Sequence, residues 1–189
     1  TGASDTNFTG TFTMNGDLSV TSAKPSGNLV QFSNVLSGVG ALTKVGTGVV
    51  VLSAANTYTG NTTVSEGTLN LASTGELRFK IQNANASNQL LGGSTVNLDG
   101  LFRLDVSALT DTTGTWNLVN VGTLTETFGG TFNLAFVGGP TFTDQGGGVF
   151  TSGNWTFTTS DGNLTLIPEP ATMALLALGG VGVLIRRRR

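Results

Sequence analysis

The hydrophobic positions of this chain form two patterns, which change near residue 168. Before this point, short apolar pieces such as Val49–Leu52 are separated by glycine, threonine and asparagine. Strands this short are not stable as isolated hairpins, so they must stack on neighbouring strands along an axis. The pattern therefore predicts an all-β body built as a parallel β-solenoid, or β-helix.

One segment near the start of the body alternates as an antiparallel hairpin does. A three-residue turn at 15–17 contains a glycine and would place Met14 opposite Leu18 and Phe12 opposite Val20. All four apolar side chains would then share one face. The sequence predicts a hairpin here.

A second hairpin is predicted directly before the change of pattern. A two-residue turn at 161–162 would place Thr159 opposite Leu164 and Phe157 opposite Leu166. Both apolar partners lie on one face, which the body can bury. We expect this C-terminal hairpin to close the open end of the β body.

The middle of the chain holds one strongly alternating strand and one ambiguous turn. Residues 76–81 place Leu77, Phe79 and Ile81 on one face, and Glu76, Arg78 and Lys80 on the other. At 99–100, a two-residue Asp-Gly hairpin would place the apolar side chains that follow the turn on the opposite face from those that precede it. This pair is therefore predicted to be a solenoid corner or a bulged turn.

The segment 37–71 has glycines where a solenoid must turn its corners. They are Gly40, Gly46, Gly48, Gly60 and Gly67. Residues 37–52, 56–60 and 62–69 resemble the autotransporter-associated β-strand repeat of bacterial passenger domains, and this resemblance implies a right-handed parallel β-helix. One copy is recognisable, so either further coils lie upstream or residues 1–36 and 72 onward supply degenerate ones.

The end of the chain is an apolar run, 171–185, between Pro170 and four arginines. Its Ala, Leu and Met residues favour a short helix, and a proline is tolerated where a helix starts. Fifteen residues rise about 22 Å, less than the roughly 30 Å of a hydrocarbon core. Arginines are costly to carry across a bilayer, so the body is expected outside the cytoplasm. A buried core helix is the alternative.

The order of these parts resembles the PEP-CTERM sorting signal of Gram-negative bacteria. The resemblance covers the range 168–189 and implies that an exported precursor is held at the inner membrane until an exosortase cleaves it. It assigns the recognition motif to Pro168, Glu169 and Pro170, and the anchor to 171–185. The membrane stop would be Arg186, Arg187, Arg188 and Arg189. Because no N-terminal segment looks like a signal peptide, the chain is expected to be a mature form or a fragment.

Composition and charge exclude several kinds of chemistry. The chain has no cysteine and no histidine, which rules out disulfides, thiol nucleophiles, imidazole bases and Cys or His metal ligands. Four of the nine basic residues are the terminal arginines, so residues 1–185 carry five basic and eleven acidic side chains, a formal charge of −6. Nucleic acid would be repelled and is not expected as a partner.

Carboxylates are the remaining candidates for a metal site or for catalysis. Asp99, Asp105 and Asp111 recur every six residues, which suits either a calcium site along a solenoid edge or, as we prefer, acids that solvate corners. A glycosidase or lyase would need glutamates such as Glu66, Glu76 and Glu126, but these have no distinctive catalytic surroundings. No catalytic residue, metal ligand or cofactor is predicted.

Two aromatic residues are candidates for stacking on sugar rings. These are Tyr58 and Trp116, although core packing is the stronger expectation for the tryptophan. If either side chain were exposed, it would support a carbohydrate-binding role.

The sequence as a whole predicts an exported, non-enzymatic structural or adhesive protein of the cell surface or extracellular matrix. The alternative is a carbohydrate-binding or carbohydrate-active module that acts on exopolysaccharide. Exosortase and, transiently, the inner membrane are the expected partners, and extracellular polysaccharide belongs to the alternative. Four segments are expected: an N-terminal β region at 1–36, the repeat at 37–71, a β-rich body at 72–167 and the sorting and anchor segment at 168–189.

Overall fold

The computed structural model describes residues 5–23 and 29–168, which contain twenty β-strands and no helix. The strands of the first part are β1 (Thr6–Phe8), β2 (Phe12–Met14), β3 (Leu18–Thr21), β4 (Leu29–Phe32), β5 (Leu36–Gly38), β6 (Leu42–Val45), β7 (Val49–Leu52), β8 (Thr62–Val64), β9 (Thr68–Leu71) and β10 (Glu76–Lys80). Those of the second part are β11 (Leu90–Gly92), β12 (Thr95–Leu98), β13 (Leu101–Asp105), β14 (Gly114–Asn117), β15 (Thr125–Phe128), β16 (Asn133–Phe136), β17 (Thr143–Asp144), β18 (Val149–Ser152), β19 (Trp155–Thr158) and β20 (Asn163–Leu166).

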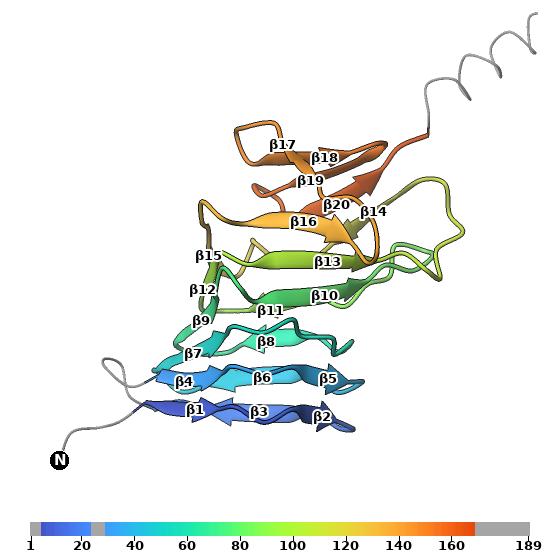
Figure 1. Ribbon diagram of the computed structural model, residues 1–189. Helices are drawn as coiled ribbons and strands as arrows, with labels where there is room; N and C mark the ends of the chain where they lie inside the picture. Colours follow the sequence, from blue (N-terminus) through green and yellow to red (C-terminus); the bar gives the residue numbers. More distant parts are fainter. Residues whose placement is uncertain (1–4, 24–28, 169–189) are drawn as a thin grey trace, which may run out of the picture.

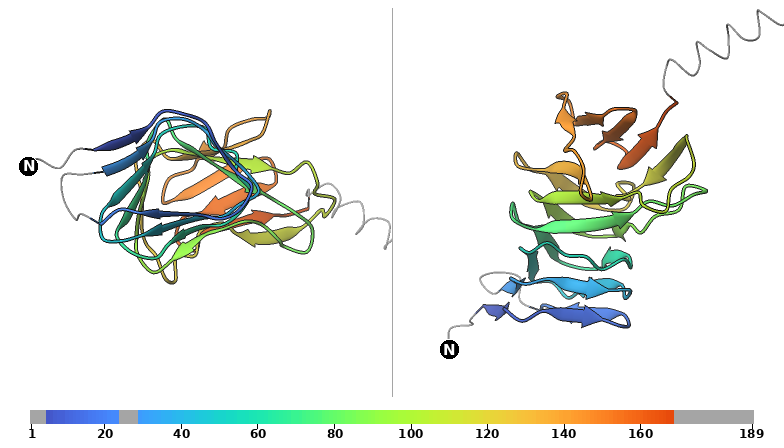
Figure 2. Two further views of the ribbon diagram at one scale, coloured as in Figure 1. Left: turned by 90° about the horizontal axis from the view of Figure 1, so that it is seen from below. Right: turned by 45° about the vertical axis from the view of Figure 1, so that its right-hand side comes forward.

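Apart from β14, the strands up to β16 wind around one axis and form parallel sheets on three faces (Figures 1 and 2). The long sheet has the order β1-β4-β7-β9-β12-β15, and the short sheet has the order β11-β8-β6-β3. The third face, here called the split sheet, consists of β2-β5 and of β10-β13-β16. Residues 55–59 join its two halves, because Thr57 N–H donates to the Leu36 carbonyl and Ala55 bridges to Glu76. The predicted β-solenoid is confirmed.

The length of chain between successive coils varies along the long sheet. Strand register aligns one residue from each level in a single row: Thr6, Val30, Val50, Leu69, Val96 and Glu126. The number of residues from one coil to the next is smallest from β7 to β9 and largest from β12 to β15. The extra residues are absorbed at the corners, while the strands keep the same stacking. Residues before 37 and after 71 therefore supply further coils, which a fixed sequence period does not reveal.

Apolar side chains stack in columns inside the solenoid. One column of the long sheet, read by strand register, contains Phe8, Phe32, Leu52, Leu71, Leu98 and Phe128. Its four central members are at most 3% exposed. Each such side chain contributes about 1.5–3 kcal/mol through burial. Alternate positions point outward, which explains why each strand needs only two inward apolar residues.

The hairpin predicted at 12–20 is wrong. β2 pairs in parallel with β5, and β3 pairs in parallel with β6, so the turn at 15–17 is a corner that leads from one face to the next. A two-stranded hairpin alone would leave the side chains of Met14 and Val20 partly in water, because nothing would cover its apolar face. Stacking on the next coil buries both side chains, so that Met14 is 5% and Val20 is 9% exposed.

Of the other two predicted turns, one is a solenoid corner as expected and the other forms a hairpin with a shifted register. The Asp-Gly pair at 99–100 is a solenoid corner, since β12 lies in the long sheet and β13 lies in the split sheet. The C-terminal hairpin forms, but Phe157 faces Leu164 and Trp155 faces Leu166, so four residues, 159–162, make the turn. The register differs from the expected one by two residues. This shift keeps the same side chains on the same face.

An antiparallel sheet covers the C-terminal end of the solenoid. Its order is β14-β20-β19-β18-β17, and it lies at the top of Figure 1. Phe157 is fully buried there, with its ring centroid 6.2 Å from that of Phe102 and 6.0 Å from that of Phe132. The cap thus shields the last parallel coils from water.

The predicted helix at 171–185 lies outside the described residues. Across the parts of the chain that the structure does describe, no helix is long and apolar enough to cross a membrane.

Candidate functional site

The three aspartates considered for a calcium site do not meet in one place. Asp105 accepts from the Arg78 Nη2 at 2.6 Å and from the Ser107 N–H at 3.1 Å. Asp111 accepts from the Ala84 N–H at 2.9 Å and so fastens the loop after β10. No group of three or more acidic residues is placed to hold a metal ion within 5–23 and 29–168. These contacts fit acids that stabilise corners.

The three glutamates considered for glycan cleavage occupy separate places. Glu76 begins β10 and accepts two hydrogen bonds of 3.0 Å from Arg103, so its carboxylate is held in an ion pair. Glu66 lies at the corner between β8 and β9, and Glu126 lies on β15. The structure gives no pair of these carboxylates a shared pocket among the described cavities.

The two aromatic candidates are both inside the protein. Tyr58 is 2% exposed and its hydroxyl lies 2.5 Å from the Thr62 Oγ1. Burial raises the pKa of Tyr58 above its ordinary value, and the hydrogen bond with Thr62 opposes this rise. Trp116 is fully buried and donates its Nε1–H to the Gln82 carbonyl at 2.7 Å. The idea that Tyr58 stacks on a sugar is wrong, and the core position of Trp116 is as expected.

A buried lysine that the sequence analysis missed ties two corners together. Lys44 points inward from β6 and is 0% exposed. Its Nζ donates to the carbonyl oxygens of Val45 at 3.0 Å, of Glu66 at 2.9 Å and of Gly46. Desolvation lowers the pKa of Lys44, while the nearby Glu66 carboxylate partly restores it. Three backbone carbonyls replace the water that an ammonium group needs.

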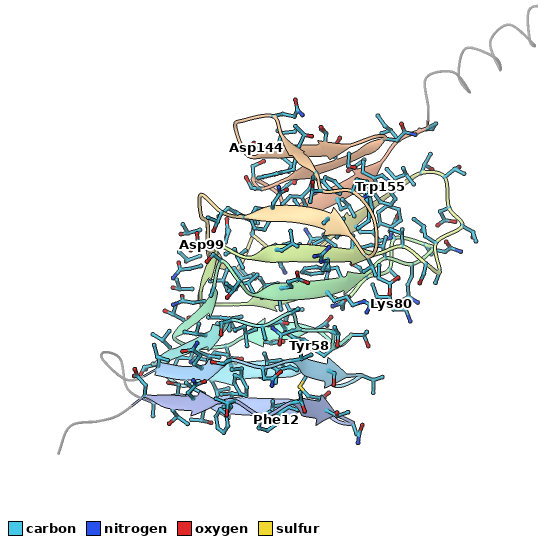
Figure 3. The ribbon with its side chains drawn as sticks, viewed as in Figure 1. Phe12, Tyr58, Lys80, Asp99, Asp144 and Trp155 are labelled. Atoms are coloured by element: carbon cyan, nitrogen blue, oxygen red, sulfur yellow. The ribbon has the colours of Figure 1, made fainter. Side chains whose placement is uncertain are left out.

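A polar depression lies on the outer surface of the split sheet. We call it the arginine groove, with a cavity volume of about 340 Å³. It is lined by Asn56, Thr57, Glu76, Arg78, Arg103, Val137 and Gly138. β10 and β13, which carry its charged residues, run side by side at the front of Figure 3, where Lys80 is labelled near the end of β10.

The charges of this groove are arranged as two crossed ion pairs. Arg78 and Arg103 are direct register partners on β10 and β13. Each arginine binds a carboxylate on the other strand, Arg78 with Asp105 and Arg103 with Glu76. Hydrogen bonding from Ser107, followed by the hydrogen bond and charge of Arg78, lowers the pKa of Asp105. The alternation of 76–81 predicted one half of this network, whereas the partners on β13 become visible only when the coils are stacked.

The N-terminal end of the solenoid presents an apolar depression. It has a volume of about 360 Å³, and its lining includes Phe8, Phe12 and Phe32. The Phe8 ring stacks on Phe32 with centroids 5.0 Å apart, yet Phe8 remains 37% exposed. β1, β2 and β3 are the terminal strands of their sheets in the described part of the chain. Within 5–23 and 29–168, no further strand packs on this end, in contrast to the capped one.

The coils, the capped end and the outward ion pairs define a parallel β-solenoid whose surface is polar and whose interior is filled. Two family models match within the chain. The Passenger-associated-transport-repeat matches residues 42–71, which are β6 to β9, and the PEP-CTERM protein-sorting motif matches residues 166–189. The two resemblances inferred from the sequence are therefore confirmed as similarities.

One relative is similar to about half of the chain. It is the adhesin BmaC autotransporter of Brucella suis biovar 1 (strain 1330), 37% identical over 98 residues. The match covers 52% of this chain but only 3% of the relative's length. No solved structure matches the chain.

The residues expected to act in sorting fall almost entirely outside the described part. Pro168 is the last described residue, and Glu169, Pro170 and the four arginines Arg186 to Arg189 lie beyond it. The matched range 166–189 contains all of them. Their individual roles remain predictions.

Proposed function

We propose that this chain is an exported, non-enzymatic surface protein of the adhesin type, in which a β-solenoid body is delivered by a cleavable C-terminal tail. The observation that carries this proposal is the combination of two matches in one chain, a sorting motif at 166–189 and a passenger repeat at 42–71. The adhesin relative supports the surface role of the body. The filled interior and the paired carboxylates fit a structural rather than a catalytic protein.

The tail would act in a fixed order. The apolar run 171–185 would hold the precursor at the inner membrane, and the four arginines would stop transfer on the cytoplasmic side. An exosortase would then recognise Pro168, Glu169 and Pro170 and cleave nearby. The body would finally reach the cell surface or the extracellular space, where it would serve as a rigid structural or adhesive element.

Processing and display in a host that contains an exosortase test this proposal. Changing Pro168, Glu169 and Pro170 to alanine, or the four terminal arginines to glutamine, should leave an unprocessed precursor that is absent from the surface. Immunoblots would report its mass, and protease accessibility on intact cells would report display. The control is Ser19→Asp, on the exposed outer side of β3. Normal processing and display of both tail variants would refute the proposed sorting.

A further inference from the structure

The basic side chains of the described residues are concentrated on one face. Lys44 is buried inside, and the other three, Arg78, Lys80 and Arg103, all lie on β10 and β13. With Glu76 and Asp105 these side chains give the groove region a formal charge of +1. The eight remaining acidic residues of the described ranges are distributed elsewhere, so an anion that approaches the body meets attraction at this face and repulsion around it.

Both arginines keep N–H donors that no acceptor among the described residues uses. A guanidinium has five N–H donors. Arg103 directs Nε and Nη2 at Glu76, and Arg78 directs Nη2 at Asp105. The Nε of Arg78 is buried and has no hydrogen-bond partner among the described residues. That buried donor is out of a ligand's reach, but the side chains of Arg78 and Arg103 are 29% and 33% exposed, so their remaining N–H groups can donate to a ligand oxygen.

The register of the strands explains why this face suits carboxylates. Arg78 and Arg103 face each other across adjacent strands, which lie about 4.8 Å apart. Like charges in this position repel, and anions beside them relieve the repulsion. Arg103 already binds the Glu76 carboxylate through two parallel hydrogen bonds of 3.0 Å, the bidentate geometry that guanidinium and carboxylate favour.

The shape of the groove suits a chain-like ligand. Its lining comes from four successive levels of the solenoid: residues 56–57, β10, β13 and residues 137–138. Val137 N–H donates to the Leu104 carbonyl, which places residues 137–138 directly beyond β13. The groove therefore runs along the solenoid axis. A net charge of +1 on an acidic body fits a polymer with one carboxylate per sugar better than the dense phosphates of a nucleic acid.

We propose that the arginine groove binds an acidic polysaccharide through the uronate carboxylates, with Arg78 and Arg103 as the binding residues. This inference rests on the proposed surface location, because such polymers occur outside the cell. Lys80 adds long-range attraction, and Asn56 and Thr57 form the polar end of the groove. Glu76 and Asp105 hold the guanidinium groups in place but also compete with the ligand.

Binding of the purified full chain in non-ionic detergent to polygalacturonate tests the inference. Dextran serves as the neutral polymer and duplex DNA as the phosphate polymer. We expect polygalacturonate to bind in a salt-dependent manner, and Arg103→Gln to weaken it about tenfold. Glu76→Gln should tighten binding because it removes a competing carboxylate. The charge-matched control for Arg103→Gln is Ser19→Asp, which changes net charge equally on another face.

The outcomes separate this inference from the proposed function. No binding, equal binding to dextran or DNA, or equal weakening by Ser19→Asp would overturn the groove assignment. The paired variant Arg78→Gln/Asp105→Asn removes one ion pair while preserving the net charge, so loss of binding by a variant that is still fully folded at the assay temperature supports a direct role, and unchanged binding would exclude Arg78. Surface display of these variants is measured in parallel: failed display of the wild-type chain refutes the proposed function but leaves the binding result intact.

Discussion

Lys44 and Glu66 lie 22 positions apart in sequence, yet the Lys44 Nζ is 2.9 Å from the Glu66 carbonyl oxygen. The same ammonium group also binds the carbonyls of Val45 and Gly46. One side chain therefore joins the corner after β6 to the corner after β8. In a solenoid, where each coil contacts only its neighbours, such an interior link strengthens the interface between two coils.

Replacing Lys44 should destabilise the body in a graded way. Lys44→Met keeps most of the volume but leaves the three carbonyls without their donor, at a cost of about 1–3 kcal/mol. Lys44→Ala adds a cavity and should cost more. Urea unfolding followed by circular dichroism measures both. The control is Lys80→Met, a partly exposed lysine that should change stability by less than about 0.5 kcal/mol. A Lys44→Met variant as stable as the wild type would show that the link contributes nothing.

Asp105 should make the body sensitive to acid. Its pKa is lowered from an ordinary value of 3.8 by Ser107 first and by Arg78 as well. A carboxylate with a depressed folded pKa stabilises the folded state above pH 3.8, and this stabilisation is lost as the pH falls below that value. Melting temperatures measured between pH 2 and 6 should fall at the acid end. In Asp105→Asn the fall should be shallower, and an unchanged profile would contradict the assignment.

Tyr58 should make the body less stable at alkaline pH. Burial raises the pKa of its hydroxyl above the ordinary value of 10.0. Above pH 10 the unfolded state loses this proton while the folded state keeps it, so stability falls as the pH rises. Lys44, whose pKa is lowered, opposes this fall, because its folded form binds fewer protons than its unfolded form below pH 10.5. Unfolding of Tyr58→Phe between pH 9 and 11 should show a smaller alkaline loss, and an equal loss would exclude Tyr58 as its source.

Gly67 occupies a corner that only glycine fits. Its φ is +74°, and a Cβ there would overlap the carbonyl oxygens of Gly48 and Gly46 on the neighbouring corner. Gly67→Ala should therefore cost at least about 1 kcal/mol from the left-handed backbone alone, and more from the overlap. Gly16→Ala is the matched control, because a Cβ at Gly16 meets nothing within 4 Å. Equal thermal stability of the two variants would contradict this explanation.

Phe157 should hold the antiparallel cap on the solenoid. Its ring packs against the aromatic groups of the last coils, including Phe102 and Phe132. Phe157→Ala should destabilise the protein by about 3–5 kcal/mol and expose the coil beneath the cap. Thermal unfolding measures the loss, and binding of a hydrophobic dye reports the exposure. Phe8→Ala, at the other end of the described solenoid, should lose much less because Phe8 is already 37% exposed. Similar losses in both variants would refute the special role of the cap.

Most of the architecture follows from local pattern. Short apolar strands separated by glycine predict coils that stack on neighbouring coils, and the alternation in 155–166 predicts the closing hairpin. The hairpin predicted at 12–20 failed because alternation alone does not tell an antiparallel neighbour from a corner that leads to another face. The next coil, through β5 and β6, buries Met14 and Val20 better than a hairpin would.

The sequence by itself determined the β-solenoid class, the acidic body, the absence of cysteine and histidine chemistry, and the similarity of the tail to a sorting signal. These properties depend on composition and on short-range order. Only the tertiary structure decided that Lys44 is buried, that Tyr58 is not a surface aromatic, and that Arg78 and Arg103 face each other beside Asp105 and Glu76. These contacts join residues 22 to 27 positions apart. The number of residues between equivalent positions on successive coils varies, because the corners differ in length. No fixed period in the sequence could therefore have aligned these contacting residues.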